Sequence, residues 1–478
     1  MAGHELRPSI LREYDIRGIV GDTLTAKDAF FLGCAYGTVL TKEGGRSVAL
    51  GQDGRLSSPA LANALAWGLA SAGLEVARVG LGPTPMLYFA EKYLVTDGAI
   101  MVTGSHNPAE YNGFKMVMRG GSVYGAGIRR LAEIARSGAF AVGSGRVVRR
   151  PVIDGYVERL LRDVDMARPL KVAWDPGNGA AGPIVTRLTQ RLPGRHIVIN
   201  GKVDGTFPAH HPDPTQPETL EQLKALVLTQ QCDLGIAFDG DGDRIGVIDS
   251  AGRILWGDQL MVFYAEEILR RRPDATFIAD VKASQVLFDE VGRMGGTALM
   301  WRTGHSLIKA KMAETGAALA GEMSGHIFFA DGYYGYDDAL YAALRLLNIV
   351  SRAEGGLAGL NDRLPKMVNT PELRFQCSDE RKFTVIEEVK ARLARAGADV
   401  EDIDGVRVKT ADGWWLLRAS NTQDVLVARC ESASTQGLTR LQSALADQLA
   451  ASALALPGKG PKAAVQARPA KALSSSIA

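Results

Sequence analysis

A repeated pattern of apolar run, polar loop and helix constrains the fold of this chain more than any other feature of its sequence. The first copy is the apolar run 47–51, the polar residues 52–55 and a helix with Ser58 expected as its N-cap and Pro59 at its first position. Polar loops also follow the apolar runs 99–102, 170–174, 232–238, 277–281 and 317–320. This alternation predicts an α/β fold whose loops gather at strand ends, where open α/β sheets bind ligands.

The pattern changes after about residue 366. A predicted amphipathic helix at 383–396 is followed by predicted strands at 406–409, 414–418 and 425–430 and by a closing helix at 437–454. These elements predict a separate α+β domain. The residues 457–478 are rich in Ala, Pro, Lys and Ser and contain no acidic residue, so we expect a disordered tail there.

The composition argues against several classes of function. Fifty-five Lys and Arg against 53 Asp and Glu, with 7% aromatic residues, do not favour a nucleic-acid-binding protein. No apolar run reaches the ~18 residues of a membrane span, and the N-terminus lacks the pattern of a secretory signal. The cysteines, at positions 34, 232, 377 and 430, have neither metal-ligand nor redox spacing, so we expect buried thiols. A cytoplasmic protein with no nucleic-acid or membrane partner is expected.

The sharpest local motif is the acidic loop, Asp-Gly-Asp-Gly-Asp-Arg at 239–244. On a regular strand its three carboxylates would be too spread out to chelate one ion, but the glycines let the backbone curl so that they converge. Three such oxygens suit a hard cation such as Mg²⁺. An EF-hand is excluded because Arg244 stands where that loop needs Gly, and Ser250 where it needs Glu. The predicted metal ligands are Asp239, Asp241 and Asp243; a solvated acidic turn is the alternative.

The second motif is the Ser105 loop, Thr-Gly-Ser-His-Asn-Pro at 103–108. A serine directly after a buried strand, in a polar loop with glycine, can act as a nucleophile. A serine that merely caps a turn is the alternative, and no Gly-x-Ser-x-Gly elbow supports a hydrolase. A metal loop elsewhere in the chain favours phosphoryl transfer, because a divalent cation neutralises charge on the transferred group.

Two further loops have the composition of binding sites. The Glu322 loop at 321–326 offers a carboxylate, a hydroxyl and an imidazole, which are groups that bind sugar hydroxyls. The Arg418 loop at 418–422 offers a guanidinium, two hydroxyls and an amide, which suit a phosphate. Ordinary turns are the alternatives for both loops. The similar stretch 302–306 contains His305, which has no assignable role without its context.

The sequence does not support either of two common nucleotide-binding motifs. The chain contains no Gly-x-x-x-x-Gly-Lys-Ser/Thr phosphate loop. A Gly-x-Gly-x-x-Gly string does occur at 177–182, but the next predicted strand ends in Asn200 rather than in an acidic residue. A tight strand-to-helix turn is therefore expected at this string.

The four loops, in this order, resemble those of the α-D-phosphohexomutase family, most closely its bacterial phosphomannomutase/phosphoglucomutase branch. The resemblance extends from about residue 14 to about residue 454. It implies four domains, of which three are related mixed α/β domains around a central cleft and the fourth is a smaller α+β domain resembling the TATA-binding-protein fold. The implied boundaries are 1–150, 151–253, 254–366 and 367–456, followed by the tail 457–478.

The resemblance also implies a reaction. Ser105 would carry a phosphoryl group and exchange it with a hexose 1-phosphate or 6-phosphate through a hexose 1,6-bisphosphate, which also serves as activator. One Mg²⁺ per chain would be held by the three aspartates and a Ser105 oxygen. The enzyme would interconvert the mannose phosphates and also the glucose phosphates, as a monomer acting on small sugar phosphates. The alternatives are a phosphoglucosamine mutase and a non-catalytic sugar-phosphate-binding protein on the same fold.

The resemblance assigns roles to individual residues of this chain. Arg244 would hold the transferring phosphate, Lys115 or His305 would move a proton, and Arg17 would face the cleft with the catalytic groups. Glu322 and Ser324 would bind the 3- and 4-hydroxyls, so that sugars differing at the 2-hydroxyl both fit. The implied substrate-binding residues are Tyr14, Lys282, Glu322, Ser324, His326, Arg418, Ser420, Asn421 and Thr422.

Overall fold

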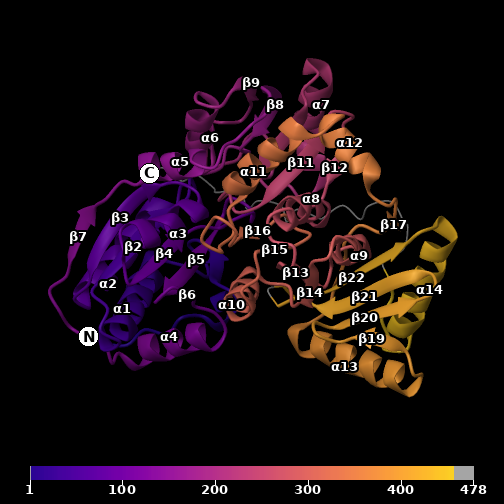
Figure 1. Ribbon diagram of the computed structural model, residues 1–478. Coiled ribbons are helices and arrows are strands. Elements are labelled where there is room, and N and C mark those ends of the chain that lie inside the picture. The colour runs from indigo at the N-terminus through magenta and orange to yellow at the C-terminus, as the bar shows by residue number, and fades with distance from the viewer. Residues whose placement is uncertain (1, 422, 457–478) are drawn as a thin grey trace, which may run out of the picture. The chain divides into compact units, whose positions relative to one another are not determined.

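The computed structural model describes residues 2–421 and 423–456. The chain forms two compact units that divide between Lys366 and Met367. The described residues form three β-sheets in the first unit and one in the second (Figure 1). Thr422 and the predicted tail 457–478 lie outside the described residues.

The first sheet is parallel at its centre and antiparallel at one edge. Strands β2, β3, β4 and β7 pair in parallel, whereas β5 is antiparallel to both β1 and β4. The strand order is β1 (Ile16–Ile19), β5 (Tyr111–Met118), β4 (Gly98–Val102), β2 (Ser47–Gln52), β3 (Glu75–Leu81) and β7 (Arg146–Arg149), with β6 (Gly121–Ser122) paired to β5.

The second and third sheets repeat this plan in smaller form. The order of the second is β12 (Ile254–Leu255), β11 (Ile245–Asp249), β10 (Leu234–Phe238), β8 (Leu170–Asp175) and β9 (Gly194–Val198). The order of the third is β14 (Thr297–Trp301), β13 (Thr276–Asp280), β15 (Leu319–Gly321) and β16 (Ile327–Phe329). In both, a parallel set of strands carries an antiparallel neighbour at one side. The predicted α/β units are confirmed.

The second unit contains an antiparallel sheet, as the change of pattern after residue 366 predicts. Its strand order is β17 (Val368–Asn369), β22 (Val425–Ser432), β21 (Gly413–Ala419), β20 (Val406–Thr410) and β19 (Asp399–Glu401), with β18 (Leu373–Gln376) paired to β22. Its helices are α13 (Asp379–Arg395) and α14 (Thr435–Ala450). Helix α14 ends before the predicted residue 454, because Ala453 adopts a left-handed φ of 57°.

Some helices of the first unit begin at a side chain that accepts a hydrogen bond from a free backbone N–H group. Thr25 and Asp28 form a reciprocal capping box at α1, and Ser284 and Asp338 cap α9 and α11. The helices of this unit are α1 (Ala26–Lys42), α2 (Ser58–Ser71), α3 (Thr84–Tyr93), α4 (Ala126–Ser137), α5 (Ile153–Leu161), α6 (Gly182–Thr189), α7 (Glu221–Gln230), α8 (Gly257–Leu269), α9 (Gln285–Arg293), α10 (His305–Thr315), α11 (Ala339–Arg352) and α12 (Gly356–Arg363), with 3-10 turns at Pro8–Ile10 and Pro217–Leu220.

One predicted cap is wrong. Helix α2 begins at Ser58 itself, so that Ser57 occupies the N-cap position. The Ser58 hydroxyl instead donates a hydrogen bond to Asp53 Oδ1, at 2.5 Å. The sequence pattern of a capping serine before proline does not reveal this tertiary partner, which decides where the hydroxyl points.

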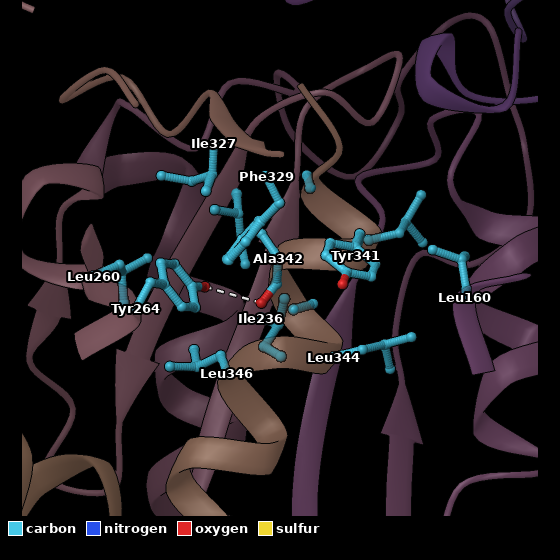
Figure 2. Close-up of a cluster of buried hydrophobic side chains, with 14 of the residues drawn as sticks. Leu160, Ile236, Leu260, Tyr264, Ile327, Phe329, Tyr341, Ala342, Leu344 and Leu346 are labelled. Carbon is cyan, nitrogen blue, oxygen red and sulfur yellow. Dashed lines mark hydrogen bonds between the residues drawn. The ribbon is translucent and has the colours of Figure 1, made fainter. Parts of the chain in front are cut away.

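The largest hydrophobic core lies in the first unit and joins helices to more than one sheet. Figure 2 shows part of it, where Ile236 of β10 and Phe329 of β16 lie close to residues of α11. The buried hydroxyl of Tyr264 donates to the carbonyl oxygen of Ala342 at 2.9 Å, which satisfies the one polar atom that this ring brings into the core (Figure 2). The four cysteines are buried and unpaired, as expected from their spacing.

Within residues 2–421 and 423–456, no helix is both long enough and apolar enough to cross a membrane.

Candidate active site

Three of the loops identified in the sequence occupy the same place in three sheets. The Ser105 loop joins β4 to β5, the acidic loop joins β10 to β11, and the Glu322 loop joins β15 to β16. In each case the first strand has a parallel neighbour and the second strand is antiparallel to the first. The repeated topology explains how loops far apart in the sequence contribute equivalent parts to one site.

Backbone contacts join the three loops. A Cβ atom on Gly240 would lie 2.4 Å from the carbonyl oxygen of Ser105, so glycine permits the acidic loop to approach the Ser105 loop this closely. On its other side, the N–H of Ile245 donates to the carbonyl oxygen of Gly325 at 3.0 Å. The acidic loop therefore lies between the other two.

The three carboxylates of the acidic loop converge, as the sequence predicts. Oxygens of Asp239, Asp241 and Asp243 lie within 4.8 Å of one another, and all three side chains are fully buried. The turn between them uses a left-handed φ of 71° at Gly242. Within residues 2–421 and 423–456, Oδ1 of Asp241 and Oδ1 of Asp243 have no hydrogen-bond partner. A cluster of buried oxygens of this kind fits a hard divalent cation.

Lys115, on β5, supplies positive charge to this cluster. Its Nζ lies 2.8 Å from Asp241 Oδ2 and also contacts Asp243. Burial alone would lower the pKa of Lys115, but these two carboxylates outweigh it and hold the pKa well above its ordinary value. Burial and the neighbouring carboxylates raise the pKa of Asp239 well above its usual range. With all three aspartates ionised, one ammonium leaves two negative charges, which a divalent cation would balance.

Ser105 is buried and has a left-handed backbone, with φ of 48°. Its hydroxyl donates to Asp239 Oδ2 at 3.1 Å, and Oγ also lies 3.2 Å from Nδ1 of His106. The hydroxyl oxygen is therefore placed beside the carboxylates that fit a cation. This contact directs the Ser105 hydroxyl toward the acidic loop.

Arg244, at the end of the acidic loop, is oriented by His326. Nε of Arg244 donates to Nε2 of His326 at 2.9 Å. Because an arginine only donates, Nε2 is the unprotonated nitrogen, and a neutral ring carries its proton on Nδ1. Nδ1 lies 3.1 Å from Asp337 Oδ2 and 3.5 Å from Asp243 Oδ1. Asp337 in turn pairs with Lys309 at 3.2 Å, so a chain of charged groups extends from the acidic loop into α10.

The Glu322 loop brings its polar groups together. The Glu322 carboxylate accepts hydrogen bonds from the N–H of Gly304, at 2.6 Å, and from the hydroxyl of Ser324, at 3.3 Å. His305 is the first residue of α10, and its ring stacks on that of His326 with centroids 5.8 Å apart. Burial lowers the pKa of His305 well below its ordinary value, which favours a neutral imidazole.

Lys282 is linked to the same loop through Asp280, the last residue of β13. Nζ of Lys282 lies 3.7 Å from Asp280 Oδ2, and Oδ1 of Asp280 accepts from the N–H of Met323 at 3.3 Å. Burial, despite the nearby Lys282, raises the pKa of Asp280 to about 6. The hydroxyl of Thr303 donates to this carboxylate at 3.1 Å, so Asp280 joins Lys282 to the residues before α10.

The two N-terminal candidates contact different parts of this region. The hydroxyl of Tyr14 donates to the carbonyl oxygen of Thr303 at 2.7 Å, beside His305. The guanidinium of Arg17, on β1, contacts the side chain of Asn107 in the Ser105 loop. Sequence-predicted residues from all three sheets of the first unit are thus brought together.

The Arg418 loop belongs to the second unit. Nε of Arg418, on β21, donates to Asp404 Oδ2 at 2.9 Å. The hydroxyl of Ser420 accepts from the N–H of Gln423 at 3.2 Å, and Asn421 is partly buried. Thr422, the last predicted residue of this loop, lies outside the described residues.

Several further side chains of this region are not among those predicted from the sequence. The hydroxyl of Thr84 donates a hydrogen bond to Asp241 Oδ2 at 2.5 Å. Oδ2 of Asp337 lies 3.1 Å from Nδ1 of His326. Asp53 and Arg55 lie beneath the Ser105 loop. Of these residues, Asp53 and Arg55 could have been identified from the sequence. They lie in the polar loop 52–55 after the apolar run 47–51, which is the pattern that identified the other loops.

Comparison with known proteins agrees with this geometry. Family models described as phosphoglucomutase/phosphomannomutase alpha/beta/alpha domains I, II and III match residues 8–141, 154–252 and 256–367. The model of the C-terminal domain of the same family matches residues 372–448. The expected four-domain α/β fold is confirmed.

Relatives and solved structures are similar over nearly the whole chain. A phosphomannomutase/phosphoglucomutase of Pseudomonas putida is 45% identical over 93% of this chain and 96% of its own length, and a phosphoglucomutase of Neisseria gonorrhoeae is 41% identical over 91% and 95%. A crystal structure of a phosphoglucomutase/phosphomannomutase family protein from Burkholderia thailandensis is 44% identical, covers 95% of this chain and 99% of its own, and has a TM-score of 0.89. Since all four domains match in order, the chain belongs to the α-D-phosphohexomutase family of phosphoglucomutases and phosphomannomutases.

Proposed function

We propose that this enzyme interconverts the 1-phosphates and 6-phosphates of mannose and of glucose. The observation that carries the proposal is the Ser105 hydroxyl, 3.1 Å from the buried carboxylate of Asp239, within a cluster of three converging aspartates. The names of the relatives at 43–45% identity, phosphomannomutase/phosphoglucomutase, support both sugars as substrates.

The proposed reaction consists of two successive phosphoryl transfers, which move two different phosphoryl groups. Phosphorylated Ser105 donates its phosphoryl group to the free hydroxyl of a hexose monophosphate; the O–P bond to Ser105 breaks, a bond to the sugar oxygen forms, and the hydroxyl proton leaves. In the second step the other sugar O–P bond of the resulting hexose 1,6-bisphosphate breaks, a bond from that phosphorus to Oγ of Ser105 forms, and the proton of Oγ ends on the sugar oxygen. Both steps depend on positioning and on neutralising negative charge.

The residues of the first unit divide this work. Asp239, Asp241 and Asp243, with the Ser105 oxygen, would hold one Mg²⁺, which when bound would neutralise charge on the transferring group. Arg244 would hold that group. Lys115 and His305 are the candidates to take or give the proton of the sugar hydroxyl, and burial favours the neutral state of His305.

The remaining candidates would bind the substrate. Glu322 and Ser324, already hydrogen-bonded to each other, would bind the 3- and 4-hydroxyls of the sugar. Contacts at those positions do not distinguish mannose from glucose, which differ at the 2-hydroxyl. Tyr14, Lys282 and His326 would complete the substrate contacts of the first unit, and Arg17 would act with the catalytic groups.

A comparison of three substrates tests the proposed function. Initial rates are measured side by side with mannose 1-phosphate, glucose 1-phosphate and glucosamine 1-phosphate, with Mg²⁺ and glucose 1,6-bisphosphate present. We expect turnover of the first two to exceed turnover of the third by at least tenfold. Faster turnover of glucosamine 1-phosphate would instead identify a phosphoglucosamine mutase, and binding without turnover of any of them would identify a sugar-phosphate-binding protein.

A prediction for the second unit concerns Arg418. We propose that the Arg418 loop, with Ser420, Asn421 and Thr422, binds a phosphate group of the substrate. Arg418→Ala should then raise the Michaelis constant by an amount equivalent to about 1.5–3 kcal/mol, because a charge-assisted hydrogen bond is lost. We also expect greater dependence on added glucose 1,6-bisphosphate, since a weakly held intermediate escapes more often.

The measurement for Arg418→Ala is the initial rate against substrate concentration, with and without added bisphosphate. Arg440→Ala is the matched control, because Arg440, on α14, is an exposed arginine of the same unit that pairs with Asp412. If both the Michaelis constant and the bisphosphate dependence of Arg418→Ala equal those of the control, the Arg418 loop does not bind the phosphate.

A monomeric state and a cytoplasmic location remain predictions.

A further inference from the structure

A buried arginine donates to the backbone of the Ser105 loop. Arg55 follows β2 and is 1% exposed. Its Nη2 donates to the carbonyl oxygens of Ser105, at 2.7 Å, and Asn107, at 2.6 Å. Its Nη1 donates to those of Pro108, at 2.5 Å, and Tyr111, at 3.0 Å. Four hydrogen bonds from one planar group thus fix the course of the chain from Ser105 to the start of β5.

Asp53 fixes the other side of the same loop. Its Oδ2 accepts from the hydroxyl of Thr103, at 2.8 Å, and from the N–H of Gly104, at 3.1 Å. Its Oδ1 accepts from the hydroxyl of Ser58, at 2.5 Å, and from the N–H of Arg55, at 3.0 Å. The Arg55 side chain pairs with this carboxylate, with Nε 3.2 Å from Oδ2. Asp53 therefore holds the residues before Ser105, and Arg55 holds those after it.

The held segment contains a backbone conformation that is costly for a serine. A left-handed φ, such as the 48° of Ser105, costs roughly 1 kcal/mol or more for a residue with a Cβ, and it persists only where the surroundings impose it. The packing is close, since a Cβ atom on Gly104 would lie 2.4 Å from Nε of Arg55. Phe207 covers the guanidinium, whose carbon lies 5.1 Å from the ring centroid.

We propose that Arg55 and Asp53 are positioning residues, which impose the strained backbone at Ser105 and so keep its Oγ beside Asp239. Both act through the backbone of the Ser105 loop rather than by contact with the sugar phosphate. The part of the proposal that concerns turnover rests on the proposed mutase function. The part that concerns the conformation of the loop does not.

The test compares two conservative substitutions of buried arginines. Arg55→Lys keeps the positive charge but cannot form the four hydrogen bonds of a planar guanidinium. Arg345→Lys is the matched control, because Arg345 is also buried, at 7% exposed, and donates to the carbonyl oxygen of Asp331 and the hydroxyl of Tyr341, both at 3.1 Å. Asp53→Asn, which keeps the side-chain size, is the second variant, for the case that Arg55→Lys does not fold.

Two readouts separate a positioning role from general support of the fold. We expect Arg55→Lys to lower kcat at least tenfold with less than a twofold change in the Michaelis constant, and the Arg345→Lys control to keep both. In hydrogen–deuterium exchange of the free protein, peptides covering 103–111 should exchange at least tenfold faster in Arg55→Lys, while peptides of β10 and β11 stay protected. Asp53→Asn should show the same pattern, with the strongest effect at 103–105.

Each outcome decides the proposal. Unchanged exchange at 103–111 in a folded Arg55→Lys or Asp53→Asn protein overturns it, as does an equal loss of kcat in the Arg345→Lys control. If the unaltered enzyme turns over none of the sugar phosphates, the proposed function fails, but exchange at 103–111 still decides whether Arg55 and Asp53 hold the loop. Normal kcat together with faster exchange would show that the held conformation does not serve turnover, and would overturn the catalytic part.

Discussion

Ser105→Ala should lower mutase turnover by about 1,000-fold or more while leaving the fold intact. The expected loss is large because Oγ is the atom that would accept and return the phosphoryl group, and no other hydroxyl can replace a missing nucleophile. The measurements are kcat for glucose 1-phosphate, with and without glucose 1,6-bisphosphate, and the intact mass of the protein. The unaltered protein should carry one phosphoryl group after incubation with the bisphosphate, and the variant should carry none.

A buried serine outside the site provides the control for this prediction. Ser351, on α11, is 5% exposed and accepts a hydrogen bond from the N–H of Ala167 at 3.0 Å. Ser351→Ala should keep both its turnover and its phosphorylation. Near-native turnover in Ser105→Ala, whether or not the bisphosphate is added, would remove Ser105 from the mechanism.

Removal of the metal should have an effect of similar size. We expect EDTA to abolish turnover and Mg²⁺ to restore it, because three buried carboxylates lie within 4.8 Å of one another and a divalent cation would offset their mutual repulsion. Asp241→Asn should raise the Mg²⁺ concentration for half-maximal rate at least tenfold, since it removes one negative charge from the cluster. Titration calorimetry with Mg²⁺ alone should show one site per chain and weaker binding to the variant.

The matched control for the metal is Asp249→Asn. Asp249 is fully buried at the end of β11 and pairs with Arg253 at 2.7 Å, but it lies outside the converging carboxylates. Its substitution should leave the Mg²⁺ requirement unchanged. Turnover that persists in EDTA, together with no heat of Mg²⁺ binding, would contradict the assignment of the acidic loop as a metal site.

Local chemistry explains why much of the fold and of the candidate site was predictable. Apolar runs of strand length followed by polar loops predict α/β units because both the burial of a strand and the exposure of its loop act within a few residues. The convergence of Asp239, Asp241 and Asp243 was predictable for the same reason, since the glycines between them are their direct neighbours. The Ser105 loop is a candidate on its own residues alone, whereas the Asp239 partner of its hydroxyl lies 134 positions later in the chain.

Residues whose partners are far away in the chain were not predictable in this way. The Lys115 ammonium pairs with Asp241, 126 positions later, and nothing near Lys115 in the sequence indicates this partner. The imidazole of His326 was identified as part of its loop, but its contact with Asp337 and its hydrogen bond with Arg244, 82 positions earlier, appear only when the acidic loop lies against the Glu322 loop. The misplaced N-cap at Ser58 has the same cause, because its hydroxyl bonds to Asp53 rather than to its own helix.

The sequence by itself determined the alternation of strands and loops, the curled acidic loop and the order of the four motifs, since each depends on residues close together in the chain. Only the tertiary structure decided which charges neutralise one another and which backbone is held under strain. Arg55 illustrates the difference: its guanidinium satisfies carbonyl groups 50 to 56 positions away, and its burial is tolerable because those acceptors and Asp53 meet it there. Desolvation and pairing depend on distance in space, which a pattern along the chain does not contain.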